Sequence, residues 1–288
     1  MNYAHDFHAG NFADVLKHVV LVRALLLLAR KDAPLRFIDT HAGAGVYDLA
    51  GERAEKTQEW RAGVGKLLDG ALTRDAMEPV ARALVKPYLE IVAGPLGEAR
   101  YPGSPRIAAA LLRPQDRLVA CELHPDAFAR LKAALAGDSR VRPVELDGYL
   151  GLKAFTPPPE RRGLVLIDPP FEDREEFARL SRALPAAVRK WPTGVFMLWL
   201  PVKDPRAAQE FARGLGRACA PLAGRGALRL DLEVAPPAPD APLARTALIL
   251  VNPPFGLFEE AQAILPELAR VLGRGRGAHL VEWIVQPR

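Results

Sequence analysis

The stretch GLVLIDPPF, residues 163–171, decides the fold. Its residues 164–167 form an unbroken apolar run that includes β-branched side chains, which is typical of a strand buried on both faces of a parallel sheet. Pro169 and Pro170 cannot donate to a β-ladder, so the chain must leave the sheet at Asp168. The sequence therefore predicts a carboxylate, a rigid turn and an aromatic ring at the carboxyl end of a central strand, where open α/β sheets bind ligands.

The turn after this strand has the chemistry of a site that holds an amino group. Asp168 and the carbonyl oxygen of Pro169 can each accept a hydrogen bond from an exocyclic NH2 group, while the ring of Phe171 can stack on the base that carries it. An Asp-Pro-Pro tripeptide also occurs in ordinary turns, so this interpretation depends on the strands around it.

Another predicted strand carries glycines at its end. Residues 35–39 have the pattern of a short strand, and the sequence THAGAG, residues 40–45, follows it. Gly43 and Gly45 permit positive φ and a close backbone approach, as a turn that cradles a nucleotide requires. The dinucleotide fingerprint GxGxxG is incomplete, because its third glycine would fall at Asp48.

Two further predicted strands end in acidic residues. Residues 117–122 form an apolar strand that ends at Glu122, and an acid in this place accepts hydrogen bonds from the ribose hydroxyls of a cofactor. The alternative for Glu122 is a solvated side chain at a strand end. Residues 141–146 form the next strand, and Asp147 and Gly148 follow it at the same sheet edge, where the adenine amine of a cofactor could be bound.

Helices are predicted around these strands. Asn11 is a suitable N-cap for the apolar residues 15–28, which predict a buried helix, and Asp14 favours the positive end of its dipole. Ser104 is the expected N-cap of the helix that follows it. Residues 48–102 are charged and helical in pattern, so we expect an inserted helical lobe between the first two strands. Amphipathic helices are expected at residues 52–68 and 74–92 in this lobe, and later ones at residues 172–189, 204–215 and 257–272.

A second PP-aromatic turn, NPPF at residues 252–255, also follows an apolar strand. Further strands are expected at residues 194–200, 228–234, 246–251 and 278–285. Asp168 ends the fourth strand, beside the glycine strand, whereas the second copy comes late and is expected toward a sheet edge. The carboxylate of an aspartate also stabilises a nitrogen that becomes cationic more strongly than the neutral side-chain amide of an asparagine does. We therefore expect the site at Asp168 rather than at Asn252.

Composition and charge allow a polyanionic partner without demanding one. The 288-residue chain carries 39 basic and 34 acidic residues, for a net charge of +5, and its 49% hydrophobic content can fill a sizeable core. The apolar segment at residues 18–29 is too short to span a bilayer and no signal peptide is evident, so a cytoplasmic protein is expected. Cys121 and Cys219 are expected to be reduced thiols, and neither they nor the histidines have the spacing of a metal site.

These motifs, in this order, resemble those of class I S-adenosylmethionine-dependent methyltransferases of the adenine-N6 type. The chain is most similar to the RlmJ family, which methylates adenine N6 in large-subunit (23S) ribosomal RNA. The resemblance spans nearly the full length and rests on FHAGNFADVLKH (residues 7–18), DTHAGAG (39–45), YPGSP (101–105), ELHP (122–125), DG (147–148), LIDPPF (166–171) and VNPPF (251–255).

The resemblance implies a fold, a cofactor and a partner. The fold would be class I, Rossmann-like α/β, with a mostly parallel seven-stranded sheet. Residues 1–47 and 103–288 would form the methyltransferase domain, and residues 48–102 a small inserted helical subdomain. The cofactor would be S-adenosylmethionine, with S-adenosylhomocysteine as its product. The partner would be 23S ribosomal RNA before full subunit assembly, bound by a monomer without a metal or a membrane.

The resemblance also implies roles for individual residues. Asp168 would be the catalytic residue, because it would accept a hydrogen bond from the target amine. Substrate contacts would come from Tyr3, His5, Lys17, Pro169 and Phe171. Cofactor contacts would come from His18, His41, Ser104, Glu122, Asp147, Gly148 and Asp168.

Two positions depart from common patterns. Phe171 stands where the family pattern usually has Tyr, so the stacking face is retained and a phenol contact is lost. His41 takes the place of the first glycine of typical methyltransferases, a departure that the family shares.

Other functions fit parts of the pattern. Methylation of a DNA adenine or of a protein glutamine would present a similar NH2 group to the turn, and methyl transfer to RNA, DNA and peptide substrates separates these activities. A nucleotide-dependent oxidoreductase could share the sheet, but S-adenosylhomocysteine would not stabilise it against heat. A non-catalytic RNA-binding module would keep its biological activity after Asp168→Ala.

Overall fold

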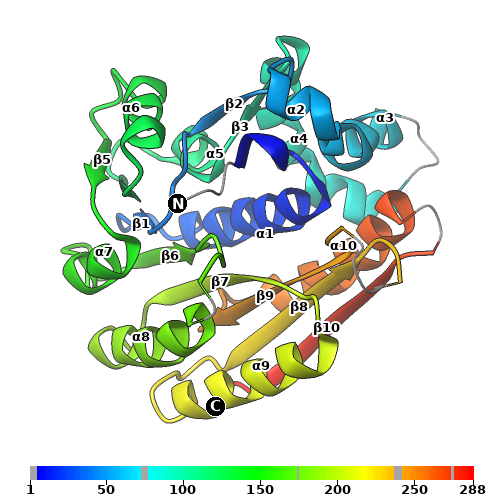
Figure 1. Ribbon diagram of the computed structural model, residues 1–288. Coiled ribbons are helices and arrows are strands. Elements are labelled where there is room, and N and C mark those ends of the chain that lie inside the picture. The colour runs from blue at the N-terminus through cyan, green and yellow to red at the C-terminus, as the bar shows by residue number, and fades with distance from the viewer. Residues whose placement is uncertain (1–4, 73–76, 174, 237–241, 274–275) are drawn as a thin grey trace.

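The structure, a computed structural model, describes residues 5–72, 77–173, 175–236, 242–273 and 276–288. One large sheet has the spatial order β10 (Ala278–Val285), β8 (Ala227–Glu233), β9 (Arg245–Val251), β7 (Val195–Pro201), β6 (Gly163–Ile167), β1 (Arg36–Asp39), β4 (Arg117–Glu122) and β5 (Val141–Glu145) (Figure 1). Neighbours from β7 to β5 pair in parallel, and β9, β8 and β10 add antiparallel pairs. The predicted mostly parallel α/β fold is confirmed. The expected seven strands are one too few, because β10 pairs with β8 as an eighth.

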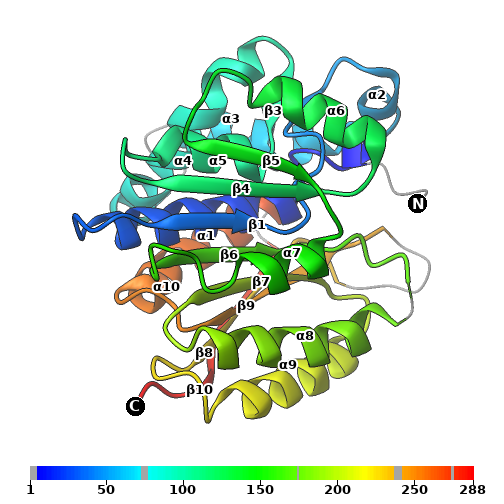
Figure 2. The same ribbon diagram turned by 90° about the vertical axis from the view of Figure 1, so that its left-hand side faces the viewer.

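Helices cover both faces of this sheet. Successive strand residues point to opposite faces, so Phe37 packs into one core and Ile38 into the other. One face carries α1 (Phe12–Ala29), α5 (Ser104–Leu111), α6 (Pro125–Ala134) and α10 (Leu257–Leu272), and the other carries α7 (Gly148–Phe155), α8 (Glu176–Lys190) and α9 (Pro205–Cys219) (Figure 2). Burial on both sides explains why the β6 sequence is apolar without alternation.

Helix α1 lies in the interior of one of these layers. As predicted, Asn11 is its N-cap, and Asn11 Oδ1 accepts hydrogen bonds from the backbone N–H groups of Ala13 and Asp14. The helix is buried along most of its length because α4 (Pro79–Gly97), α5 and α10 pack around it. Its polar residues Asp14, Lys17 and His18 are therefore buried too, with exposed fractions of 2%, 4% and 1%.

The segment between β1 and β4 has more breaks than its sequence pattern predicted. Strand β2 (Val46–Asp48) pairs with β3 (Arg100–Pro102), and between them lie α2 (Glu52–Thr57), a π-helical turn (Arg61–Gly65), α3 (Lys66–Leu72) and α4. The helix expected at residues 52–68 is interrupted at Gln58, which has a φ of 51°, and again at Gly63. A Cβ atom at Gly63 would lie 2.2 Å from the carbonyl oxygen of Gly10, so this glycine allows the segment to approach the start of α1. The subdomain boundaries at residues 48 and 102 stay a prediction.

The other expected elements are present with small shifts in their bounds. Helix α8 begins at Glu176 instead of residue 172, because Asp173 accepts hydrogen bonds from the backbone N–H groups of Glu175 and Glu176 and holds this segment in a turn. Cys121 and Cys219 are buried free thiols. Within the described ranges, no helix has the length and apolar character needed to cross a membrane.

Candidate active site

A cavity of about 1120 Å³ lies at the carboxyl ends of the parallel strands. Its walls come from the N-terminal segment, from α1 and from the loops that follow β1, β4, β5 and β6. The predicted site residues that line it are His5, Lys17, His18, His41, Ser104, Glu122, Asp147, Gly148, Asp168, Pro169 and Phe171. Tyr3 lies outside the described residues. The structure thus brings distant parts of the sequence around one cavity, while the role of each residue stays a prediction.

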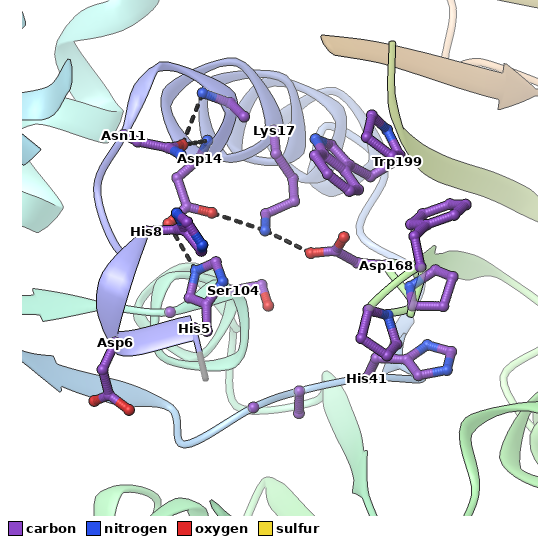
Figure 3. A pocket seen from close by; sticks show the side chains of 18 of the residues that line it. His5, Asp6, His8, Asn11, Asp14, Lys17, His41, Ser104, Asp168 and Trp199 are labelled. Atoms are coloured by element: carbon purple, nitrogen blue, oxygen red, sulfur yellow. Dashed lines mark hydrogen bonds and ion pairs between the residues drawn. The ribbon is translucent and has the colours of Figure 1, made fainter. Parts of the chain in front are cut away.

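Asp168 is paired with a buried lysine in this cavity. The ammonium group of Lys17 lies between two carboxylates, with Nζ 2.5 Å from Asp168 Oδ2 and 2.8 Å from Asp14 Oδ1 (Figure 3). Burial lowers the pKa of Lys17, but the two carboxylates outweigh it and hold that pKa well above its usual value. Asp168 Oδ1 has no hydrogen bond to a described residue, so this oxygen is available to a ligand.

Asp14 is a site residue that the sequence interpretation missed, because it assigned Asp14 only to the helix dipole. Asp14 Oδ2 accepts hydrogen bonds from the Gly10 backbone N–H and from His5 Nε2, each at 2.9 Å. Burial raises the pKa of Asp14, but His5 and Lys17 outweigh it and hold that pKa well below its usual value. The i,i+3 spacing of Asp14 and Lys17 on a helix that is otherwise apolar was the available signal for a buried pair.

A second buried carboxylate, Asp39, lies at the end of β1. Its Oδ2 accepts a hydrogen bond of 2.6 Å from the hydroxyl of Ser104, and its Oδ1 accepts one of 3.3 Å from the backbone N–H of His41. Burial raises the pKa of Asp39 to about 7, although the Ser104 hydrogen bond opposes the shift. Ser104 was expected to be a helix N-cap, and this is wrong. Gly103 takes that position, because Ser104 is the first residue of α5 and its hydroxyl donates to Asp39 instead.

The acidic strand ends also hold backbone turns in place. Glu122 accepts a hydrogen bond of 2.9 Å from the N–H of Gly43 and one of 2.8 Å from the N–H of His124, so it joins the glycine turn to the start of α6. Asp147 is the N-cap of α7 and forms an ion pair of 3.2 Å with Arg179. A carboxylate has about four lone-pair positions, so Glu122, which uses two of them, can still accept from a ligand in the cavity, whereas Asp147 already accepts four hydrogen bonds.

The loop after β1 packs closely against the start of α7. A Cβ atom at Gly148 would lie 2.2 Å from the carbonyl oxygen of Thr40 and 2.5 Å from His41 Nε2, so this position requires glycine. The hydroxyl of Thr40 donates to the carbonyl of Leu166 and therefore accepts from His41 Nδ1 at 2.8 Å. Burial lowers the pKa of His41 to about 4, so the ring is neutral and its Nε2 is an acceptor.

The side of the cavity beyond Asp168 is aromatic. The ring of Phe171 lies 5.2 Å from that of Phe177 and 5.7 Å from that of Trp199, measured between centroids. Trp199 lines the cavity at the end of β7, together with Pro201. Its position at the exit of the neighbouring parallel strand could have identified Trp199 as a site residue, since parallel strands end at the same edge.

The second PP-aromatic turn does not reach this cavity. Strand β9 runs antiparallel to β7, so Asn252 lies at the opposite end of the sheet. The expectation that this copy lies toward a sheet edge is wrong, because β9 is flanked by β7 and β8. The Asn252 amide donates hydrogen bonds to the carbonyl oxygens of Pro192 and Gly194, and it accepts one from the N–H of Arg225. Asn252 is 1% exposed and thus joins three loop segments inside the fold.

Asn252→Ala is expected to lower the free energy of unfolding by about 2–4 kcal/mol, because it leaves buried carbonyl groups without a donor. Asn252 also has a φ of 54°, which alanine adopts less readily than asparagine. Urea unfolding followed by circular dichroism measures this loss. Ligand affinity of the folded protein should not change, and a weaker affinity would show that the two turns are coupled.

The fold and the cavity define a doubly wound α/β protein whose binding site for a nucleotide-type cofactor adjoins a carboxylate and an aromatic wall. The family model described as "Ribosomal RNA large subunit methyltransferase D, RlmJ" matches residues 32–285, and the chain belongs to this family. Two proteins named ribosomal RNA large subunit methyltransferase J are similar along 99% of both chains, with 37% identity in Haemophilus influenzae and 36% in Escherichia coli. A solved Legionella pneumophila structure is 32% identical, has a TM-score of 0.83, and matches over 96% of this chain and 98% of its own.

Proposed function

We propose that this protein transfers the methyl group of S-adenosylmethionine to the N6 amine of an adenine in 23S ribosomal RNA. Membership of the RlmJ family supports the reaction and the substrate class. The observation that carries the assignment of the site is the ion pair of Lys17 with Asp168 Oδ2, which leaves Oδ1 available to an amine in the cavity. We further propose that the protein acts as a cytoplasmic monomer on RNA before full subunit assembly, and that residues 48–102 form an inserted subdomain.

The residues around the cavity fit S-adenosylmethionine. The cavity volume of about 1120 Å³ is ample for a ligand of this size. His18 lines the cavity and is 1% exposed, and its Nε2 is a buried polar atom without a partner among the described residues. The cofactor would be held by His18, His41, Ser104, Glu122, Asp147 and Gly148, with Asp168 at the reacting end. When bound, its sulfonium group supplies an activated methyl group.

The protein's own task is to position the amine and to stabilise its charge. An adenine amine is a weak nucleophile because its lone pair is delocalised into the ring. Asp168 Oδ1 and the Pro169 carbonyl oxygen would each accept a hydrogen bond from one of the two amine N–H groups, which localises the lone pair on nitrogen. Lys17 fixes the Asp168 carboxylate through Oδ2, and the negative charge of Asp168 offsets the positive charge that develops on N6. Asp168 Oδ1 is then placed to accept the proton that N6 releases.

The target base must leave its stack before it can enter the cavity. Unstacking costs a few kcal/mol, and least for a base that is already single-stranded, which favours a target adenine in an unpaired segment of the RNA. Stacking on Phe171 would return about 1–3 kcal/mol of this cost. The RNA substrate would then be selected by its accessible base as well as by its sequence.

Phe171→Leu is expected to lower kcat/KM for RNA by about 5- to 150-fold, since it removes the stacking face. Phe171→Tyr keeps that face and should retain activity close to that of the unmodified protein. Steady-state methyl transfer to a 23S transcript measures both effects, and the Kd for S-adenosylhomocysteine controls for damage to the cofactor site. Full activity of Phe171→Leu would show that another group, such as Trp199, supplies the stacking face.

The experiment that tests the proposed function compares three substrate classes. Purified protein and labelled S-adenosylmethionine are incubated with a 23S transcript, with duplex DNA and with a glutamine-containing peptide. Mass-spectrometric mapping of ribosomal RNA from cells with and without the gene then locates the modified adenine. Transfer to DNA or peptide alone would overturn the proposal.

A further inference from the structure

His18, Tyr101 and Tyr88 form a buried chain of hydrogen bonds beside the cavity. His18 Nδ1 lies 2.7 Å from the hydroxyl of Tyr101, which in turn lies 3.0 Å from the hydroxyl of Tyr88. The residues come from α1, β3 and α4, and their exposed fractions are 1%, 0% and 0%. Because Nδ1 is bound to Tyr101, the unpartnered Nε2 is the nitrogen that His18 can offer to the cavity it lines.

The hydroxyl protons of this chain can run in two directions. In the first, Tyr88 donates to Tyr101, Tyr101 donates to His18 Nδ1, and the ring carries its own proton on Nε2. In the second, His18 Nδ1–H donates to Tyr101 and Tyr101 donates to Tyr88, so the Tyr88 proton has no acceptor among the described residues. Tyr88 is completely buried, and an unpaired donor there is costly. If His18 Nδ1–H and Tyr88 both donated to Tyr101, the proton of the fully buried Tyr101 would be unpaired instead. The first direction is favoured because it leaves the unpaired proton on Nε2, beside the cavity.

His18 is neutral, so its tautomer decides what it offers to a ligand. Burial lowers the pKa of His18 to about 3; Asp14 opposes this shift and Lys17 adds to it. A neutral imidazole has one donor and one acceptor nitrogen. If Tyr101 donates to Nδ1, then Nε2 is the donor, which is the reverse of the tautomer of His41 in the loop after β1.

We propose that Tyr101 is a positioning residue that holds His18 as the Nε2–H tautomer, so that His18 donates a neutral hydrogen bond to the carboxylate at the amino-acid end of the cofactor. This inference rests on the proposed function. A carboxylate is favoured as the acceptor because the N-terminus of α5, at Ser104, lines the same cavity and favours an anion.

The tautomer is directly observable in the ligand-free protein. Long-range ¹H–¹⁵N correlation spectra of the uniformly ¹⁵N-labelled full chain distinguish a protonated from an unprotonated ring nitrogen at each histidine. The spectrum of His18→Gln assigns the His18 signals, because they alone disappear. We expect the proton on Nε2. A proton on Nδ1, or a mixture of the two tautomers, would overturn the inference whatever the ligand proves to be.

Binding measurements test the consequence for the ligand. Calorimetry compares S-adenosylhomocysteine with 5′-methylthioadenosine, which lacks the amino-acid end. His18→Asn places its amide nitrogen near the Nδ1 position, so it should weaken S-adenosylhomocysteine binding by about 10- to 100-fold. His18→Gln can place an N–H donor near the Nε2 position, so it should retain most of the affinity. Tyr101→Phe should weaken S-adenosylhomocysteine binding by about 2- to 10-fold. None of these variants should change the affinity for 5′-methylthioadenosine.

Tyr88→Phe is the matched control for packing. It removes the Tyr88 hydroxyl, so Nδ1 becomes the acceptor left to the buried Tyr101 hydroxyl among the described residues, and neither the tautomer nor the affinity should change. If Tyr101→Phe weakened the binding of both ligands equally, its role would be merely structural and the inference would be overturned. If the unmodified protein bound neither ligand, the proposed function and the ligand part of this inference would both fail, while the spectrum would still decide the tautomer.

Discussion

Asp168→Asn is expected to lower kcat for methylation of 23S ribosomal RNA by about 10²- to 10³-fold, the largest loss expected from any single substitution in this chain. The amide keeps the shape of the side chain and one acceptor oxygen. It loses the negative charge that offsets the charge developing on N6, and charge stabilisation is the main contribution the protein can make to this reaction. Lys17 also loses one of the two carboxylates that bind its ammonium group.

Single-turnover methyl transfer measures this loss, and the Kd for S-adenosylhomocysteine, measured in parallel, separates chemistry from cofactor binding. Asn252→Ala is the matched control, since it changes the other PP-aromatic turn, which is absent from the described cavity wall. That variant should be less stable yet fully active per folded molecule. A rate for Asp168→Asn within about tenfold of the unmodified protein would show that another group stabilises the amine.

The ends of the strands could be predicted because their signals are local. The apolar run of β6 and the two prolines after it place Asp168 at the carboxyl end of a buried strand without any knowledge of the fold. Glu122 and Asp147 follow from the same reasoning, and the structure places both around the same cavity. The carboxyl ends of parallel strands lie at the same edge of the sheet, so a prediction of each strand end also predicts that these residues lie close together.

The partners of these residues could not be predicted, because they are distant in the sequence. Lys17 and Asp168 are 151 positions apart, and only the packing of α1 against the sheet brings them within 2.5 Å. The N-cap prediction for Ser104 failed for the same reason, since Asp39 is 65 positions away and binds the hydroxyl that a local rule assigns to the helix. A local pattern therefore identifies the residue types of this site but not their hydrogen bonds.

The direction of β9 relative to β7 was the other property that the local sequence pattern did not show. Asn252 follows an apolar strand and precedes two prolines, as Asp168 does, and the two sequences differ little in their local signals. Only the antiparallel pairing of β9 with β7 sends Asn252 to the opposite end of the sheet. The sequence predicts the second turn toward a sheet edge, but β9 is the third strand from the edge, so strand direction rather than edge position separates the two turns.

Lys17→Met is expected to lower both stability and activity. Removing the ammonium group leaves the buried carboxylate of Asp14 and the half-buried carboxylate of Asp168 as neighbours without a cation between them. Losing one partner of a buried ion pair costs about 3–5 kcal/mol of unfolding free energy. One carboxylate of the pair should take up a proton, and a protonated Asp168 cannot offset charge on N6, so kcat near pH 7 should fall by about 10²-fold.

The pH dependence of stability and of activity separates the two effects of Lys17→Met. In the unmodified protein the lowered pKa of Asp14 gives a stabilisation that is complete above the ordinary aspartate pKa and is lost as the pH falls below it. In Lys17→Met the folded carboxylate pair should bind a proton more tightly than the unfolded chain does. Mild acidification should therefore stabilise this variant more than the unmodified protein, in which the raised pKa of Asp39 gives a smaller gain of the same sign. Its activity should change in the opposite sense and recover as rising pH removes the proton from the pair. Lys17→Arg keeps the positive charge and should match the unmodified protein in both respects. If activity stayed low at every pH while Lys17→Arg was active, the ammonium group would be needed for a contact with the RNA rather than for the charge state of Asp168.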